Sequence, residues 1–202
     1  MNAEKKLTEI KREDIIEAAV YEFKKNGFNA TSMDRIAATA KVSKRTVYNH
    51  FESKEALFQT ITQAACDRIT QVSEHPYSSA IPVGEQLRKI AEQEIALLIS
   101  PEFLDTVRMI TSESLVTPAL TRTTFENFQD NSIGIVKWVK LANEDGKLKV
   151  NDPVRAGKQF LALIENFALW PQLYGLKPAP DKKEQKEIIN STVDMFLNTY
   201  GV

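Results

Sequence analysis

Apolar side chains recur with the spacing of an α-helix along almost the whole chain, and this periodicity limits the possible folds more than any other feature. In the expected first helix, about Thr8 to Asn26, Ile15, Ala19 and Phe23 fall four residues apart on one face. Only Lys147 to Val150 alternate apolar and polar residues as a surface strand does. Seven glycines in 202 residues leave little material for phosphate-binding loops. The sequence therefore predicts an all-α fold of about nine helices.

Residues 31 to 50 predict two short helices joined by a tight turn. Thr31 is expected to cap the first of these helices, with Asp34 three residues later in a weaker form of the capping box. Residues 41–43 form the turn, and Ser43 can cap the second helix, which runs to about His50. With the longer helix before them, these elements predict a helix-turn-helix head over residues 1–53.

The second short helix has an apolar side and a polar side. Val47 and Phe51 lie four residues apart and can face inward. The side chains left outward are two cations, an aromatic ring and an amide, and they suit the groove and phosphates of DNA. These four are Lys44, Arg45, Tyr48 and Asn49. The pattern fits a recognition helix, the part of a helix-turn-helix that enters the major groove.

This segment resembles the DNA-binding region of the tetracycline-repressor (TetR) family of bacterial regulators. The matching positions are Ser43, Thr46, Tyr48, His50, Phe51, Ser53, Lys54, Glu55 and Leu57. One departure is Lys41, which stands where the family often has glycine, and a non-glycine residue with positive φ costs about 1 kcal/mol. Near the C-terminus, residues 167–173 resemble the AefR-like class of C-terminal domains in this family.

The resemblance implies double-stranded operator DNA as a partner and assigns roles around the second short helix. Lys44, Arg45 and Tyr48 would face base edges, and Lys54 would bind a phosphate beside free N–H groups in the first turn of the next helix. The full set of implied DNA contacts is Thr31, Ser32, Lys44, Arg45, Thr46, Tyr48, Asn49, His50 and Lys54.

Residues 54–202 carry more apolar surface than a DNA-binding head requires, and we expect them to form a helical ligand-binding and dimerisation domain. A pocket lined by aromatic rings, one carboxylate and one thioether would suit an apolar or amphipathic effector of unknown identity. The alternative is ordinary core packing, because aromatic residues at helical spacing commonly fill a core. The candidate lining residues are Phe103, Met109, Glu113, Phe125, Phe128, Trp138, Phe160, Phe167 and Trp170.

A helix-turn-helix head reads one half-site, so a two-fold homodimer would place two such heads on a palindromic operator. The resemblance puts the dimer interface on the last two helices. Its candidate residues are Ala156, Gly157, Phe160, Leu161, Ile164, Ile189, Val193, Phe196, Leu197 and Tyr200. The alternative is that these residues pack within one chain. Pro171 is expected to end or kink the first of the two helices.

The remaining chemistry argues against other classes of function. The chain has two histidines and one cysteine, from which neither a nucleophile–base pair nor a metal site can be assembled. Cys66 is expected to be a buried small hydrophobe rather than a redox sensor. We therefore expect no enzyme, no cofactor, no metal and no membrane partner, and a cytoplasmic location. The leading interpretation is a ligand-released transcriptional repressor, and the alternative is an architectural DNA-binding protein of the same fold without an effector.

Overall fold

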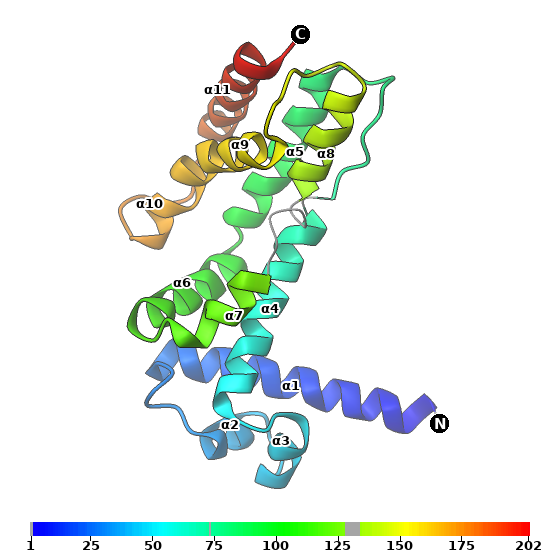
Figure 1. Ribbon diagram of the computed structural model, residues 1–202. Helices are drawn as coiled ribbons and strands as arrows, with labels where there is room; N and C mark the ends of the chain where they lie inside the picture. The colour runs from blue at the N-terminus through cyan, green and yellow to red at the C-terminus, as the bar shows by residue number, and fades with distance from the viewer. Residues whose placement is uncertain (1, 73, 128–133) are drawn as a thin grey trace. The chain divides into compact units, whose positions relative to one another are not determined.

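The computed structural model describes residues 2–72, 74–127 and 134–202, and within these ranges it describes the side chains of residues 7–72, 74–126 and 134–202. Across these ranges the chain forms eleven α-helices and no β-strand, which confirms the all-α prediction (Figure 1). None of the helices in these ranges is long and apolar enough to cross a bilayer. The helices are α1 Asn2–Asn26, α2 Met33–Thr39, α3 Lys44–His50, α4 Lys54–Val72, α5 Val83–Leu98, α6 Pro101–Val116, α7 Ala119–Asn127, α8 Gly134–Glu144, α9 Pro153–Ala168, α10 Trp170–Leu173 and α11 Lys182–Tyr200.

The helices group into two compact units that do not follow chain order. The N-terminal unit combines the chain up to Ala65 with Asp105–Asn127, and the C-terminal unit combines Cys66–Leu104 with the chain after Asn127. Both α4 and α6 therefore contribute residues to each unit. The division of function after residue 53 stays a prediction.

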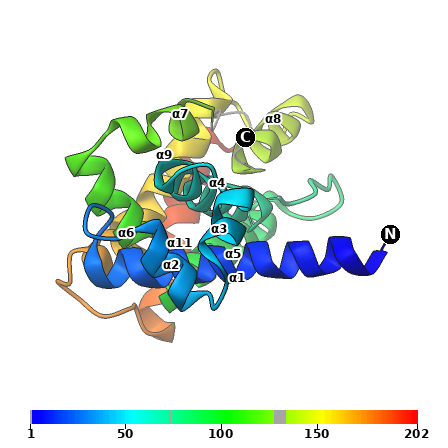
Figure 2. The same cartoon turned by 90° about the horizontal axis from the view of Figure 1, so that it is seen from below.

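The N-terminal unit is built around the apolar face of α1. Figures 1 and 2 show α2 and α3 on one side of α1, and Figure 1 shows α6 and α7 on the other side. Ile15 and Val47 are fully buried in the shared core. Phe23 of α1, Phe28 of the following loop and Phe58 of α4 are in mutual ring contact within this core. The core fixes both short helices against α1, so neither has to be stable alone.

The turn between α2 and α3 has the conformation expected from its sequence. Lys41 has a φ of 55°, which confirms that this lysine adopts the left-handed conformation favoured by glycine. The backbone N–H of Val42 then donates to the carbonyl oxygen of Ala37 at 3.0 Å. Ser43 caps α3 as predicted, since its hydroxyl accepts from the N–H of Thr46 at 3.1 Å.

The cap of α2 differs from the prediction. Ser32, and not Thr31, is the N-cap, and its hydroxyl accepts from the N–H of Arg35 at 3.2 Å. Thr31 is instead 2% exposed, and its hydroxyl donates to the carbonyl oxygens of Gly27 at 2.8 Å and Glu22 at 3.1 Å. The expected capping residue was therefore wrong by one position, because Thr31 has carbonyl partners at the end of α1 that the local pattern did not indicate.

The C-terminal unit packs α5, α8, α9 and α11 together, with α10 beside α9. Trp138 and Phe160 are buried in its core. A methyl group added to Gly157 would lie 2.8 Å from a methyl of Val136, so this glycine permits the close approach of α8 to α9. Gln86 fixes the loop before α5: it receives hydrogen bonds from the Trp138 indole and the N–H of Ser78, and donates to the carbonyl oxygens of Ser78 and Ile81.

The number of helices and the start of the first one differ from the prediction. The described ranges hold eleven helices where about nine were expected, and the first helix begins at Asn2 rather than near Thr8. As expected from Pro171, α9 ends just before it, at Ala168, because proline has no N–H for a further helical bond. Lys147–Val150 form no strand, although Leu148 makes one isolated bridge with Gly201.

Candidate nucleic-acid interface

The orientation of α3 follows from one buried residue and one cap. Val47 has no exposed surface, and Phe51, directly after the helix, is 5% exposed. The Ser43 cap fixes the start of the helix directly after the turn. With its apolar side held in the core, α3 must present its polar side outward.

Arg45, Tyr48 and Asn49 form the exposed flank of α3, and all three were expected to face outward. The Tyr48 side chain has 46% of its surface exposed, so its ring is accessible to a partner. A guanidinium group, a phenol and an amide together supply hydrogen-bond donors, an acceptor and a stacking surface. The arrangement can therefore contact both phosphates and base edges.

Lys44 shares this flank, but it is paired with an acidic residue of α2. Its ammonium nitrogen lies 2.8 and 3.0 Å from the two carboxylate oxygens of Asp34. The hydrogen bond and the charge of Asp34 raise the pKa of Lys44, which also lies over the Tyr48 ring at 5.9 Å. Asp34 thus orients an exposed cation of α3 and partly neutralises its charge, a role that the local sequence pattern did not indicate.

Thr46 and His50 are half-buried, so they lie at the edge of the exposed flank. The hydroxyl of Thr46 lies 2.8 Å from that of Ser43, within the capping interaction. Arg12 of α1 places its guanidinium carbon 5.2 Å from the centre of the Phe51 ring. This contact brings Arg12, an exposed cation of α1, to the end of α3. Arg12 was not among the predicted DNA contacts.

Thr31 and Ser32 occupy different environments before α2. Ser32 is exposed and can offer its hydroxyl to a phosphate while it caps the helix. Thr31 is buried and its hydroxyl donates to backbone carbonyls, so its side chain does not face the exposed surface. Among the predicted DNA contacts, Thr31 is thus the one that the structure places inside the unit.

Lys54 holds the loop between α1 and α2 against the first turn of α4. Its ammonium group donates to the carbonyl oxygens of Phe28 at 2.6 Å, Thr31 at 2.9 Å and Asn29 at 3.4 Å. The same nitrogen lies 4.3 Å from the centre of the Phe28 ring. Three carbonyls match the three donors of an ammonium group, so in this structure Lys54 binds protein rather than presenting a free charge.

The predicted effector-binding residues are divided between the two units. In the C-terminal unit, Phe103, Trp138 and Phe160 are buried core residues. Phe167 is 55% exposed and Trp170 is 37% exposed, and the Trp170 ring stacks on Tyr174. The structure therefore does not gather these five predicted side chains around one pocket.

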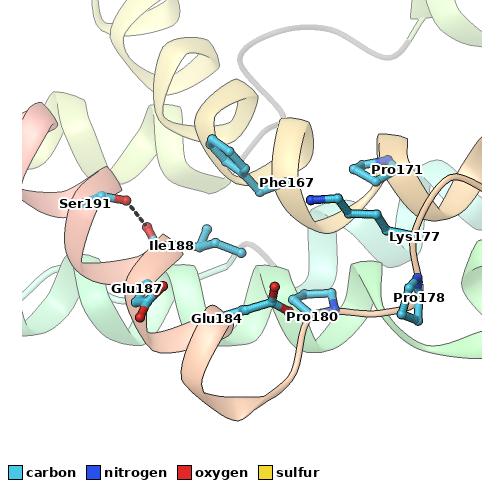
Figure 3. A pocket seen from close by; sticks show the side chains of 9 residues that line it. All are labelled: Phe167, Pro171, Lys177, Pro178, Pro180, Glu184, Glu187, Ile188 and Ser191. Carbon is cyan, nitrogen blue, oxygen red and sulfur yellow. Dashed lines mark hydrogen bonds between the residues drawn. The ribbon is translucent and has the colours of Figure 1, made fainter.

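Phe167 lines a hollow of about 320 Å³ between α9, α11 and the loop that joins α10 to α11. Lys177, Glu184 and Ile188 are among its other lining residues. Figure 3 shows the ammonium group of Lys177 and the carboxylate of Glu184 directed into the space beside Phe167. This hollow combines an apolar wall with both signs of charge, a mixture typical of sites for amphipathic molecules.

The other predicted effector-binding residues belong to the N-terminal unit or lie outside the described ranges. Met109 and Glu113 both line a hollow of about 400 Å³ in that unit. Phe125 of α7 is 49% exposed and is not among the residues lining this hollow. Phe128 lies outside the described residues.

The predicted dimer residues mostly face the interior of the C-terminal unit. Ala156, Phe160, Ile164 and Val193 have no exposed surface, and Gly157 contacts Val136 of α8. Ile189 and Phe196 are also buried, while Leu161, Leu197 and Tyr200 are half-buried. The alternative of packing within the chain therefore accounts for the buried positions, since a side chain without exposed surface cannot contact a second subunit.

A different set of residues occupies the outward face of α9 and α11. Phe167 is 55% exposed and Met195 is 56% exposed, and both line a shallow hollow of about 570 Å³. Leu163 and Tyr200 contribute partly exposed apolar surface to the same hollow. The sequence could indicate that both helices are amphipathic, but not that the apolar surface continues onto this face.

Comparison with known proteins finds similarity over both parts of the chain. Residues 15–61 match the family described as bacterial regulatory proteins, tetR family, and residues 85–202 match the AefR-like transcriptional repressor, C-terminal domain. Over 87 residues the chain is 36% identical to the HTH-type transcriptional repressor NicS of Pseudomonas putida, covering 43% of this chain. This match spans 36% of the repressor's length, little more than a third.

Several solved structures match nearly the whole chain, among them two that are more than 30% identical to it. A TetR family transcriptional regulator from Pseudomonas syringae pv. tomato is 36% identical, with a TM-score of 0.79, and the match covers 95% of this chain and 97% of that one. The flavonoid-responsive regulator FrrA is 31% identical, with a TM-score of 0.78 and the same coverage of 95% and 97%.

Proposed function

Because the chain belongs to the TetR family of bacterial regulatory proteins, we propose that it represses transcription by binding a palindromic operator as a homodimer, from which a small apolar or amphipathic molecule releases it. The observation that carries the proposal is the exposed flank of α3, where Arg45, Tyr48 and Asn49 project from a helix anchored by Val47. A helix with this flank suits the major groove, which admits one α-helix.

The homodimer is supported by the outward face of α9 and α11. Exposed Phe167 and Met195 form an apolar surface that a second copy of the chain would remove from water. A two-fold pair of heads reads two half-sites about one helical turn of DNA apart, roughly 34 Å. The proposed operator is accordingly palindromic.

The ligand response is supported by two observations. FrrA, which is 31% identical, is described as a flavonoid-responsive regulator. In this chain, hollows with mixed apolar and charged walls occur in both units. The proposal includes no enzymatic activity: Cys66 is 4% exposed, and burial raises the pKa of its thiol, which disfavours the reactive thiolate.

The direct test is fluorescence anisotropy with a duplex that carries the promoter region of the protein's own operon. Tyr48→Ala and Arg45→Ala are expected to weaken binding while leaving the thermal unfolding temperature unchanged, because both side chains are exposed. Arg45→Ala should also lower the slope of log K against log salt by about 1. Lys149→Ala, an exposed lysine of the C-terminal unit, is the matched control and should bind as the wild type does. Failure of the wild type to bind any duplex at low salt would overturn the proposal.

A further inference from the structure

The hollow in the N-terminal unit has a pre-formed apolar wall. It lies between the end of α1, the N-terminal part of α4 and the middle of α6, and has a volume of about 400 Å³. Phe23, Phe28, Phe58 and Met109 supply this wall. The three ring centres are 5.4, 5.7 and 5.2 Å apart, so each ring is held by the other two. A short hydrocarbon chain or a single ring would meet aromatic and thioether surface here.

The same hollow contains two carboxylates with different partners. Asp105 is paired, since one of its oxygens lies 2.5 Å from the ammonium nitrogen of Lys24 and the other lies 3.2 Å from a guanidinium nitrogen of Arg108. Glu113 differs, because its Oε1 is enclosed and accepts no hydrogen bond from any residue in the described ranges. An enclosed carboxylate oxygen without a donor is unfavourable, and a rotation of the Glu113 side chain that turns this oxygen toward the N–H group of a bound molecule would relieve it.

We propose that this hollow is a binding site for a small amphipathic amine, with its ammonium group at Glu113 and its apolar part against the phenylalanine wall. A cation is favoured because the site's own cations, Lys24 and Arg108, are already paired with Asp105. Aromatic faces add a further attraction for a cation. The inference rests on the proposed ligand response, to which it adds a location and a ligand class.

The position of Phe28 gives the site a route to the DNA-reading helices. Its ring lines the hollow, while its carbonyl oxygen accepts the 2.6 Å hydrogen bond from Lys54. Lys54 also holds the carbonyl of Thr31, one residue before the cap of α2. An amine that packs against Phe28 therefore acts on the loop that positions α2, and through α2 on α3. Coupling of this kind typically changes affinity by roughly 5- to 150-fold.

Methyl resonances of ¹³C-labelled methionine in the full-length protein provide the test. Met109 lines the hollow, whereas Met195 is exposed on the outward face of α11 and serves as the internal control. The probes are 4-phenylbutylamine and its neutral counterpart 4-phenyl-1-butanol. We expect the amine to shift the Met109 resonance at a concentration about tenfold lower than the alcohol, the factor given by one charge-assisted hydrogen bond, without moving Met195.

Glu113→Gln separates the charge from the shape of the site. The Glu113→Gln variant is expected to bind the amine only as well as the alcohol. In the wild type, a saturating concentration of the amine should change the affinity for duplex DNA about fivefold or more. Equal binding of amine and alcohol by the wild type, an unmoved Met109 resonance, or an unchanged duplex affinity at saturation would each overturn the inference. The comparison of amine and alcohol binding by the wild type tests the inference even if Glu113→Gln does not fold. Duplex binding without amine, measured on the same sample, tests the proposed function separately.

Discussion

The ammonium nitrogen of Lys54 lies 2.6 Å from the carbonyl oxygen of Phe28, a contact that joins the first turn of α4 to the loop between α1 and α2. Further hydrogen bonds to the carbonyls of Asn29 and Thr31 follow the same loop. Lys54 therefore helps to place α2, and with it α3, against the rest of the N-terminal unit. Lys54, which the sequence suggests as a phosphate ligand, instead links α4 to the loop between α1 and α2 within the N-terminal unit.

Substitution of Lys54 by methionine should lower stability as well as DNA affinity. Methionine keeps the apolar stem but leaves three carbonyls without their donor. Hydrogen bonds of charged groups are each worth roughly 1.5–3 kcal/mol, and we expect a net loss of about 2 kcal/mol because water replaces part of it. For a chain of this length the Tm should fall by about 4–8 °C, measured by differential scanning calorimetry.

Lys44→Met is the matched control for this prediction. Lys44 also makes an ion pair, with Asp34, but its side chain is 59% exposed and surface pairs contribute little to stability. The Lys44 variant should bind duplex DNA more weakly and keep the wild-type Tm. If both variants unfold at the same temperature, Lys54 does not tie the loop to α4.

The roles of Lys54 and Ser43 show which features the sequence could reveal. The Ser43 cap depends on an N–H group three residues later, so it is readable from the local pattern. α6 likewise begins at a local signal, because Pro101 has no N–H group and is tolerated in the first turn of a helix. The carbonyl partners of Lys54 lie 23 to 26 residues earlier in the chain, and backbone carbonyls leave no mark on the sequence. The same limit explains why Thr31 was mistaken for a cap.

Substitution of Asp34 by asparagine should strengthen DNA binding. Asp34 holds the ammonium group of Lys44 at 2.8 Å and adds a negative charge beside the exposed flank of α3. Without that charge, Lys44 can pair with a phosphate, and repulsion of the DNA is reduced. We expect the duplex affinity to rise roughly threefold to tenfold in an anisotropy titration at low salt. Glu187→Gln makes the same change in net charge on α11 and should leave the affinity unaltered; an equal gain in both variants would assign the effect to net charge alone.

The phenol of Tyr77 should titrate at unusually high pH. Burial, a 2.6 Å hydrogen bond to Asp145 and the charge of that carboxylate raise the pKa of Tyr77 to about 12 from an ordinary value of 10.0. Because the pKa is higher in the folded state, the stabilisation is complete below pH 10.0 and is lost as the pH rises through about 12. Tyrosinate absorbance should show one of the five tyrosines ionising last. Tyr77→Phe should remove this late step, and Asp145→Asn should shift it to lower pH; a late step that survives in Tyr77→Phe would contradict the assignment.

The pairing of α9 and α11 shows a second limit of sequence analysis. Their periodicity correctly indicates amphipathic helices, but it does not identify what covers each face. Phe160 and Phe196 satisfy the pattern by packing on each other inside the unit, with ring centres 5.4 Å apart. Phe167, two helical turns after Phe160, lies outside. Only the packed structure separates the residues that fill the core from those left to meet a partner.

Opposite faces of α9 and α11 should therefore respond differently to substitution. The double variant Phe167→Glu, Met195→Glu places two charges on the outward face, where the native side chains are 55% and 56% exposed. We expect it to keep its helical circular dichroism but to behave as a monomer in light scattering. It should also bind an operator more weakly than the wild type, because each head then engages its half-site alone.

Gly157→Ala tests the opposite, inward face of α9, which packs against α8. The added methyl group would lie 2.8 Å from a methyl of Val136, so α8 and α9 must separate or Val136 must move. Overpacking of this kind typically costs about 1–3 kcal/mol. We expect a lower Tm with the dimer retained at concentrations well above its dissociation constant. If Gly157→Ala instead dissociates the protein while the double glutamate variant remains a dimer, the contact between subunits involves the face occupied here by α8, and the outward face of α9 and α11 is not the interface.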